Sequence, residues 1–265
     1  MSSSDSALEA AIWQAAQTIL AAEYVTALTG AGISVESGIP PFRGPGGLWT
    51  RYGEPPMDGY QRFLADPKKA WEERLAPSGA SQEIRDTIAR AEPNPGHYAF
   101  VTLEDSRVLR WLITQNVDNL HRRAGSQHLL EIHGNSTLVR CLKCTARFPM
   151  SAISYLELPP RCLQCEGILK NDTVAFGEPI PDDVLEQCWK AVQQCDCMIV
   201  AGTSALVTPA AYLPMQVRER GGTLIEVNLY ESDITRLCQI SLRGQAGEIL
   251  GRLAHTVLQL RTAQA

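Results

Sequence analysis

The sequence predicts an α/β fold: a Rossmann-like, doubly wound parallel sheet, a small zinc-ribbon module and an insertion that combines a loop with helices. Three observations predict it. Short apolar runs without alternation recur between segments of helical periodicity, as expected of parallel strands covered by helices on both faces. Small-residue loops follow two of these runs, at the strand ends where open α/β sheets bind ligands. Two Cys-x-x-Cys pairs lie between these loops in the chain.

Size and composition exclude several classes of protein. The chain has 265 residues, of which 45% are hydrophobic and 20% charged, as in a globular protein with one large domain and a small module. The net charge is −5 and no long basic run occurs, so nucleic acid is not an expected partner. No segment has the pattern of a signal peptide or a membrane span, and we expect a cytoplasmic monomer with no membrane partner.

The first expected elements are a helix and a strand. Apolar residues recur at helical spacing over 7–22, with Asp5 or Ser6 as the cap. The short apolar run at 24–28 is then a strand that leads into a glycine loop.

That glycine loop is a candidate site for an anion. Gly30, Ala31 and Gly32 would let backbone N–H groups approach a phosphate. Val35 stands where a dinucleotide fingerprint has its third glycine, so the pattern alone also fits a tight turn. The next stretch, 44–58, is dense in glycine and proline, which excludes the helix and second strand of an ordinary dehydrogenase. It is typical of a lid over a ligand, the alternative being a surface connection.

A polar cluster follows the second expected strand. The preceding elements are three helices and a strand, at 59–75, 81–91, 95–105 and 108–114. Gln115, Asn116 and Asp118 come directly after the strand, where they could hydrogen-bond sugar hydroxyls or an amide group. Asn116 or Asp118 could instead cap a helix.

A histidine follows the next apolar segment. His133 stands beside Gly134 after the run at 129–132, and because imidazole titrates near neutrality it is a candidate general base. A lone histidine is more often structural, so both interpretations remain open at this point.

The strongest local signal is a set of four cysteines. Cys141, Cys144, Cys162 and Cys165 form two Cys-x-x-Cys pairs with seventeen residues between them. Each pair presents two thiolates on one turn, and two pairs complete a tetrahedral site, most often for zinc. Four sulfur ligands leave no position for water or substrate, so one structural zinc ion per chain is expected. Redox-active disulfides are the alternative.

The carboxyl-terminal part alternates helices and strands again. An extended segment at 172–179 ends in a turn. Helices are expected at 182–195, from 208 onward and at 246–260, and strands at 197–201 and 223–227. Gly202, Thr203 and Ser204 form a second small-residue loop after a strand, and Asn228 follows the last expected strand. The other cysteines are most simply buried apolar residues: Cys188, Cys195, Cys197 and Cys238.

Taken together, these motifs resemble the sirtuin family of NAD-dependent protein lysine deacylases, in its prokaryotic type. The resemblance covers nearly the whole chain and rests on the order and spacing of the motifs. They are Gly30-Ala-Gly32-Ile-Ser34, Ser37-Gly38-Ile-Pro40 with Phe42-Arg43, Thr114 to His121, His133-Gly134-Asn135, the four cysteines, Phe176-Gly177-Glu178, Gly202-Thr203-Ser204 with Pro209-Ala-Ala211, Val227-Asn228 and Gly244-Gln-Ala-Gly247.

The resemblance implies a division of the chain. A discontinuous NAD-binding domain would comprise residues 1–44, 92–137 and 170–265. A cofactor-binding loop and helical insertion would occupy 45–91, and the zinc-ribbon module 138–169.

The resemblance also implies NAD⁺ as co-substrate beside a structural Zn²⁺. Gln115, Asn116 and Asp118 would hold the nicotinamide ribose and carboxamide, while Ser204 and Asn228 would reach the phosphates and adenosine. The full set of implied cofactor-binding residues is Gly30, Ala31, Gly32, Phe42, Arg43, Gln115, Asn116, Asp118, Gly202, Thr203, Ser204 and Asn228.

In this family's chemistry, the acyl-lysine carbonyl oxygen attacks the ribose anomeric carbon, nicotinamide leaves and an alkylimidate forms. His133 would be the base that activates a ribose hydroxyl, with Asn116 as a second catalytic residue. The products would be free lysine, nicotinamide and O-acyl-ADP-ribose. An acyl-lysine peptide would add as a strand beside the extended segment. The implied substrate-binding residues are Val174, Phe176, Gly177, Glu178, Leu206 and Val207.

Two positions depart from the family pattern. Pro41 replaces a common aspartate, so a polar contact from that position is lost. Members specialised for acidic acyl groups carry a Tyr-x-x-Arg pair, whereas this chain has Trp71-Glu-Glu-Arg74, whose glutamates would repel a succinyl carboxylate. We therefore expect acetyl or longer apolar acyl groups. The alternatives are a desuccinylase, a protein mono-ADP-ribosyltransferase, and an NAD-sensing or zinc-ribbon interaction module without activity.

Overall fold

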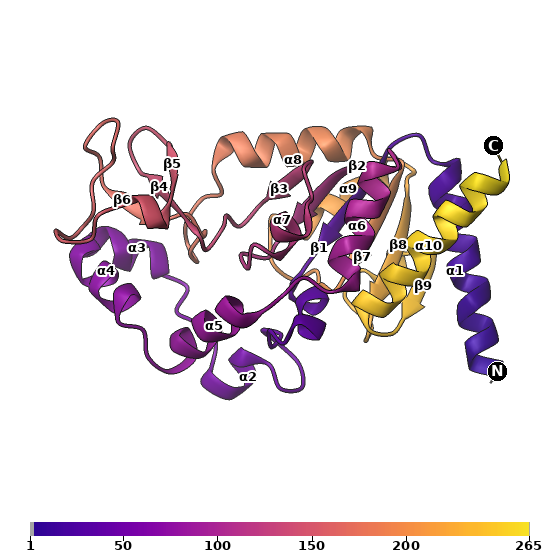
Figure 1. Ribbon diagram of the computed structural model, residues 1–265, viewed down its shortest axis with the longest axis horizontal. Helices are drawn as coiled ribbons and strands as arrows, with labels where there is room; N and C mark the ends of the chain where they lie inside the picture. The colour runs from indigo at the N-terminus through magenta and orange to yellow at the C-terminus, as the bar shows by residue number, and fades with distance from the viewer. Residues whose placement is uncertain (1–2, 265) are drawn as a thin grey trace.

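Six parallel strands form the main sheet of the computed structural model, which describes residues 3–264 (Figure 1). In spatial order they are β3 Leu129–Glu131, β2 Leu109–Thr114, β1 Val25–Thr29, β7 Cys197–Ala201, β8 Thr223–Asn228 and β9 Ile240–Arg243. The order reverses between β1 and β7, and a doubly wound sheet binds ligands at such a point, outside the carboxyl ends of its strands. The predicted fold class is confirmed.

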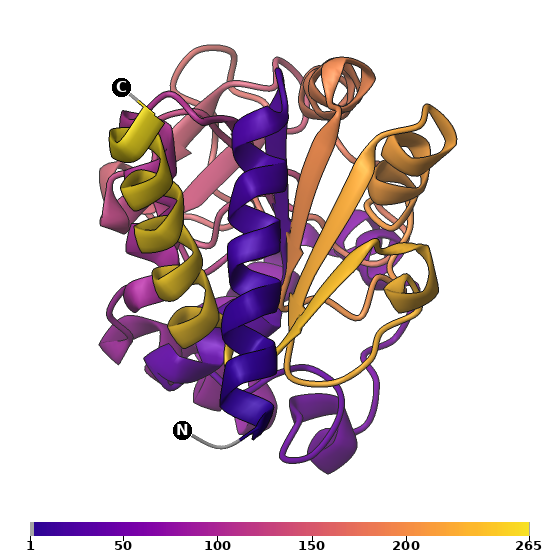
Figure 2. The ribbon, with the colours of Figure 1, turned by 90° about the vertical axis from the view of Figure 1, so that its right-hand side faces the viewer.

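Alternate strand residues place the sheet between two apolar cores. In β7, Ile199 and Ala201 belong to one core, and Met198 and Val200 belong to the other. The first core lies under α1 Ser3–Ala21, α6 Pro95–Asp105 and α10 Ala246–Gln264. The second lies under α8 Asp182–Gln194 and α9 Tyr212–Glu219. Figure 2 shows the two helical layers on opposite sides of the strands.

A second, smaller body lies at the far end of the molecule from α1 and α10 (Figure 1). Its antiparallel sheet has the order β5-β4-β6, and two helices pack on it. These elements are β4 Leu138–Cys141, β5 Arg147–Pro149, β6 Leu169–Asn171, α3 Gly59–Ala65 and α4 Pro67–Leu75. Phe63 and Trp71 share a core with Val139 and Leu169, and the Trp71 indole N–H donates to the Leu169 carbonyl at 2.8 Å. We call residues 59–75 and 138–171 the zinc lobe.

Short elements connect the two bodies. They are the 3₁₀-helix η1 Ala31–Ser37 and the helices α2 Leu48–Tyr52 and α5 Gly79–Arg90. The short helix α7 Leu120–Ala124 joins β2 to β3 within the main sheet. Two further 3₁₀ turns are η2 Met150–Ala152 and η3 Thr235–Leu237. Within residues 3–264, no helix has the length and apolar character needed to cross a membrane.

Several expected helices have different bounds in the structure. The first already includes Asp5 and Ser6, which lie inside the helix and not before it. The single helix expected at 59–75 is broken at Asp66, because the ring of Pro67 disfavours a helical residue before it. Asp66 instead caps α4, its carboxylate accepting from a backbone N–H in the first turn.

Other elements were not predicted as the structure has them. The glycine loop forms a 3₁₀-helix, η1, and the stretch at 44–58, which was expected to be a lid, contains α2 despite its glycines and prolines. The helix expected from 208 begins at Tyr212, after a turn. Strand β9 was missed because its four residues give too short a pattern.

Candidate active site

The two small-residue loops meet at the point where the strand order reverses. Thr29 of β1 pairs with Ala201 of β7, so the loops leave the sheet at the same level. The Gly32 N–H donates to the Gly202 carbonyl at 2.7 Å. A Cβ on Gly32 would lie 2.7 Å from the Gly202 Cα, and Gly202 has a φ of 61°. Both positions therefore need glycine for the loops to approach each other.

Asn116, Asp118 and Ser34 form a buried hydrogen-bonded cluster beside these loops. The Asn116 amide N–H₂ donates to the Gly30 carbonyl and to Ser34 Oγ, both at 3.1 Å. Ser34 Oγ donates to Asp118 Oδ2 at 2.7 Å, and the Leu120 N–H donates to Asp118 Oδ1 at 2.9 Å. Burial raises the pKa of Asp118. Asp118 thus holds the first turn of α7 and faces the cluster at once, so the two interpretations of this residue coexist.

A small pocket opens on this cluster. Its floor is polar and its walls are apolar. The lining residues are Ala31, Ser34, Ile39, Pro40, Phe42, Leu48, Ile84, Ile88, Asn116, Val117 and Asp118. Ile84 and Ile88, on α5, were not predicted as site residues, although their spacing of four already indicated one apolar helix face.

Thr203 links the residues on the other side of the loops. Its hydroxyl accepts from the Gln115 amide at 2.9 Å, and its carbonyl accepts from the Asn228 amide at 2.9 Å. Ser204, the next residue, is exposed at the surface. Three strand ends therefore converge on the loop that follows β7.

The His133 side chain has a defined tautomer. Its Nδ1 lies 3.0 Å from the Gln115 carbonyl oxygen, which can only accept, so Nδ1 carries the hydrogen. The lone pair is then on Nε2. Burial lowers the pKa of His133, while the hydrogen bond to Gln115 opposes that shift, so the ring is neutral at physiological pH. A neutral imidazole with a free Nε2 can accept a proton.

Backbone geometry fixes this histidine beside the extended segment. The Val174 N–H donates to the His133 carbonyl at 2.9 Å. Gly134 has a φ of 76°, and a side chain there would collide with the Asp172 carbonyl. Glycine is therefore required next to the candidate base.

The segment predicted to bind a peptide is extended and ends in a turn. The Phe176 carbonyl accepts from the Tyr60 N–H at 3.0 Å, and the Ala175 N–H donates to Glu178 Oε2 at 2.8 Å. Within residues 3–264, the Val174 carbonyl and the Phe176 N–H take no protein partner. Of the residues expected on the opposite side, Leu206 is exposed and Val207 half-buried.

Aromatic side chains join the lid to this segment. The Trp49 ring centroid lies 5.3 Å from that of Phe42 and 5.9 Å from that of Phe176. The Arg43 guanidinium lies 4.2 Å above the Trp49 ring and 3.6 Å from a Glu54 oxygen. Trp49 was not predicted as a site residue, and an aromatic inside a glycine-rich lid was the available signal.

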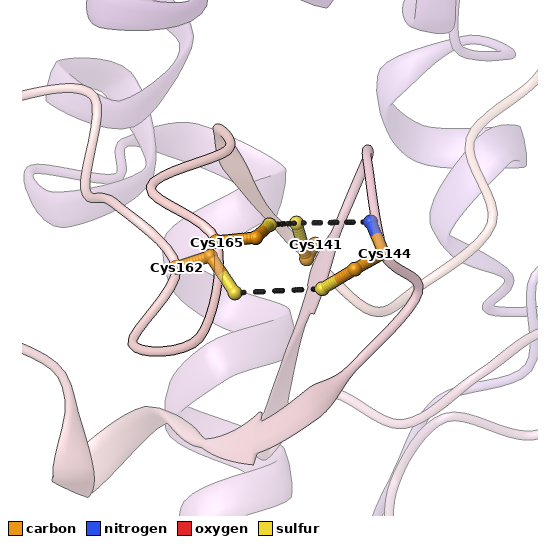
Figure 3. Close-up of side chains that lie close together, drawn as sticks. All are labelled: Cys141, Cys144, Cys162 and Cys165. Carbon is orange, nitrogen blue, oxygen red and sulfur yellow. Dashed lines mark hydrogen bonds between the residues drawn. The ribbon is translucent and has the colours of Figure 1, made fainter.

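The four predicted zinc ligands come together in the zinc lobe. Their sulfur atoms all lie within 4.8 Å of one another, and none forms a disulfide. Figure 3 shows the thiols of two loops turned toward a common centre. The Cys141–Cys165 and Cys144–Cys162 sulfur distances are 3.5 and 3.6 Å, close to the roughly 3.8 Å of a tetrahedral site with Zn–S bonds of about 2.3 Å. The donor set fits a structural zinc ion.

Known proteins share these features in the same order. The model of the Sir2 family matches residues 30–209, which include the loops, the candidate base and the cysteines. This chain belongs to the Sir2 family. The resemblance seen in the sequence is confirmed.

The Sir2-family relatives match along almost their whole length. The NAD-dependent protein deacylase of Pyrococcus abyssi is 43% identical over 254 residues, which cover 94% of this chain and 99% of the relative. The NAD-dependent protein deacylase 1 of Archaeoglobus fulgidus is 43% identical, covering 91% of this chain and 96% of the relative.

Solved Sir2 structures have the same fold. A complex of a Sir2 homologue with NAD is 42% identical with a TM-score of 0.78, covering 95% of this chain and 94% of the other. A complex of Sir2 with a p53 peptide and NAD⁺ is 31% identical with a TM-score of 0.73, covering 93% and 97%.

Proposed function

We propose that this Sir2-family enzyme removes acetyl or longer apolar acyl groups from protein lysines with NAD as co-substrate. Nicotinamide and O-acyl-ADP-ribose are the other products. Family membership and the names of the relatives support the enzyme class, an NAD-dependent protein deacylase. The tautomer of His133 carries the chemistry, because its Nε2 lone pair is free while Nδ1 is held by the Gln115 carbonyl.

Each site residue has a task in this reaction. NAD supplies a glycosidic bond whose cleavage makes the ribose carbon electrophilic. The pocket beside Asn116 and Asp118 would receive the nicotinamide ring, with the Asn116 amide oriented by Ser34. His133 takes a proton from a ribose hydroxyl at Nε2. The aromatic contacts of Trp49 hold the lid against the extended segment and exclude water from the site.

The acyl preference rests on α4. Trp71 is buried and its N–H is used by the Leu169 carbonyl. The Arg74 guanidinium donates to the Ser136 carbonyl at 3.3 Å. Trp71 is therefore occupied in packing α4 on the sheet of the zinc lobe and Arg74 in binding the Ser136 carbonyl, and neither supplies the polar pair that an acidic acyl group would require.

We also place the enzyme in the cytoplasm as a monomer. All eight cysteines are free thiols, which supports a reducing compartment. The pocket, the candidate base and the peptide segment all come from one chain, so a second subunit is not needed to complete the site. Sedimentation of the purified protein at micromolar concentration should give a mass of one chain.

The function is tested with NAD and a panel of acetyl-, butyryl- and succinyl-lysine peptides. Mass spectrometry should detect nicotinamide and O-acyl-ADP-ribose in equal amounts, with faster turnover of the apolar acyl groups. Nicotinamide release without acyl peptide, with ADP-ribose attached to protein, would instead identify a mono-ADP-ribosyltransferase. Faster turnover of the succinyl peptide would contradict the acyl preference.

A further inference from the structure

A buried ion network joins the zinc lobe to the extended segment. Two carboxylates, Asp172 and Glu178, bracket the segment, and their side chains are 4% and 2% exposed. Three cations reach them, one from each strand of the zinc-lobe sheet: Arg140 of β4, Arg147 of β5 and Lys170 of β6. Within residues 3–264, no cationic side chain from outside the zinc lobe forms an ion pair with these carboxylates.

The Glu178 carboxylate is held on both oxygens. Arg140 Nη2 lies 2.6 Å from Oε1, and Lys170 Nζ lies 2.8 Å from Oε2. The same Oε2 accepts the Ala175 N–H at 2.8 Å, which closes the turn of the extended segment. The remaining Lys170 donors go to the carbonyls of Asn171 and Thr173. Every hydrogen on this buried ammonium is therefore used to shape residues 171–178.

The Asp172 carboxylate extends the network to the candidate base. Its Oδ1 lies 3.0 Å from Arg147 Nε and 3.4 Å from Arg140 Nε. Its Oδ2 accepts the Asn135 N–H at 3.2 Å, two residues after His133. The two carboxylates thus fix one backbone N–H close to His133 in the chain and one within the extended segment.

The register of the zinc lobe connects this network to the metal. Arg140 and Lys170 are paired residues of β4 and β6, and the next pair is Cys141 with Leu169. Cys141, an expected zinc ligand, is therefore the neighbour of Arg140 in β4, and Arg140 and its partner Lys170 both form ion pairs with Glu178. Burying charges is costly unless their geometry is maintained, so loss of order in β4 would release the carboxylate.

We propose that the zinc lobe positions the substrate-binding segment, with Arg140, Lys170 and Glu178 as positioning residues for the acyl-lysine peptide. Zinc acts on the reaction through this network, and it sets affinity for the peptide without setting affinity for NAD. The peptide part of this inference rests on the proposed function, whereas the ordering of residues 172–178 by the zinc lobe does not.

Glu178→Gln tests the network because glutamine has the same shape without the charge. The readout is the Kd of a fluorescein-labelled peptide with one Nε-acetyl-lysine, measured without NAD so that no turnover occurs. Loss of a charge-assisted pair should weaken peptide binding about tenfold. The Kd of NAD should stay the same. The matched control is Glu226→Gln, a similarly buried carboxylate that pairs with Arg243 outside the zinc lobe, and it should leave peptide affinity unchanged.

Cys144→Ser tests the link to zinc through hydrogen exchange of residues 172–178. Exchange should rise in this variant and in Glu178→Gln, while exchange in β1 and β7 stays low. Glu178→Gln should add little to the loss of peptide affinity in the Cys144→Ser background, because both changes break one pathway. If Glu178→Gln does not fold, Lys170→Gln/Glu178→Gln removes both charges and should show the same loss of peptide affinity.

Several outcomes would overturn the inference. Unchanged exchange at 172–178 after loss of zinc would do so, as would equal weakening of peptide and NAD by Glu178→Gln. Additive effects of Cys144→Ser and Glu178→Gln would also contradict it. If the wild-type protein binds no acetyl-lysine peptide, the proposed function fails, and the exchange measurement alone then decides whether zinc orders the segment.

Discussion

The main sheet and the zinc lobe are held together by different forces. Every residue of β1 and β7 is buried, and each face of the sheet has its own apolar core. The strands of the zinc lobe have only three or four residues, and four thiols and a network of ion pairs supplement its small core. Apolar burial does not depend on a bound metal, whereas a site built from thiolates does. The main sheet should therefore stay folded when removal of the metal disorders the zinc lobe.

Loss of the metal should give the largest effect. Cys144→Ser removes a ligand from a site whose zinc contributes on the order of 10 kcal/mol in small zinc domains. We expect zinc to be lost and the zinc lobe to unfold while the main sheet stays folded, as followed by metal analysis and hydrogen exchange. The control is Cys238→Ser, which changes a half-buried cysteine outside the lobe and should keep its zinc. Retention of zinc by Cys144→Ser would contradict the four-thiolate site.

A mutation that creates a cavity in the core of the main sheet should have the opposite pattern, because it should destabilise the sheet without removing the zinc. Leu28 of β1 is fully buried, so Leu28→Ala should lower the free energy of unfolding by about 2–5 kcal/mol. Zinc content should be unchanged, since Leu28 belongs to a core of the main sheet. Urea denaturation with metal analysis measures both, and Leu156→Ala, at a residue that is 96% exposed, should change stability by less than about 0.5 kcal/mol. Loss of zinc in Leu28→Ala would show that the two regions unfold together.

Acid should weaken the main sheet through two buried histidines. Burial lowers the pKa of His97 to about 4, and burial also lowers that of His121, whose ring lies 4.7 Å from that of His97. An unfolded histidine titrates near 6.5, so between pH 6.5 and 4 the unfolded chain binds protons that the native protein does not. Stability should therefore fall by about 2–3 kcal/mol for His97 alone as the pH drops through this range.

This pH dependence is measured by urea denaturation at a series of pH values. His97→Asn should reduce the slope of the unfolding free energy against pH below pH 6.5. Above pH 6.5 the slopes of the variant and the wild type should agree, because His97 is then neutral in both the native and the unfolded state. A slope identical to that of the wild type would show that His97 is not the titrating group.

The smallest expected effect concerns the polar contacts around the NAD loops. Thr203→Val keeps the shape of the side chain but removes the acceptor of the Gln115 amide. Loss of a hydrogen bond worth about 1 kcal/mol should raise the KM for NAD roughly fivefold. The KM for an acetyl-lysine peptide should not change, and Thr203→Ser should restore the wild-type value. A change in the KM for the peptide alone would contradict the assignment of Thr203 to NAD binding.

Local patterns were sufficient to predict most strands of the main sheet and the polar cluster at its edge. The apolar run of β7 and the cluster from Gln115 to Asp118 each occupy a few consecutive residues, and the structure brings the cluster into contact with the loops that follow β1 and β7. The cysteine pairs also meet as their spacing predicts. Such features are visible because their chemistry lies in one short segment.

Features that depend on distant partners were not predictable. Glu178 was expected among the substrate-binding residues, but the enclosure of its carboxylate by Arg140 and Lys170 was not expected, because no local pattern reveals the pairing of these residues across β4 and β6. In our proposal, Glu178 acts on peptide binding through the backbone turn that its carboxylate closes. The break between α3 and α4 at Asp66 is a different case. Pro67 indicated a break in the sequence, but the prediction of one helix over 59–75 gave more weight to the spacing of the apolar residues.

The central claim is that His133 is the base of an NAD-dependent deacylase. Steady-state release of nicotinamide from NAD and an acetyl-lysine peptide should fall about a thousandfold in His133→Ala, with zinc content and unfolding free energy retained. His255→Ala, which changes an exposed histidine on α10, should keep full turnover. Turnover of His133→Ala within a factor of about two of the wild type would contradict the claim, since a positioned base accelerates by at least about a hundredfold.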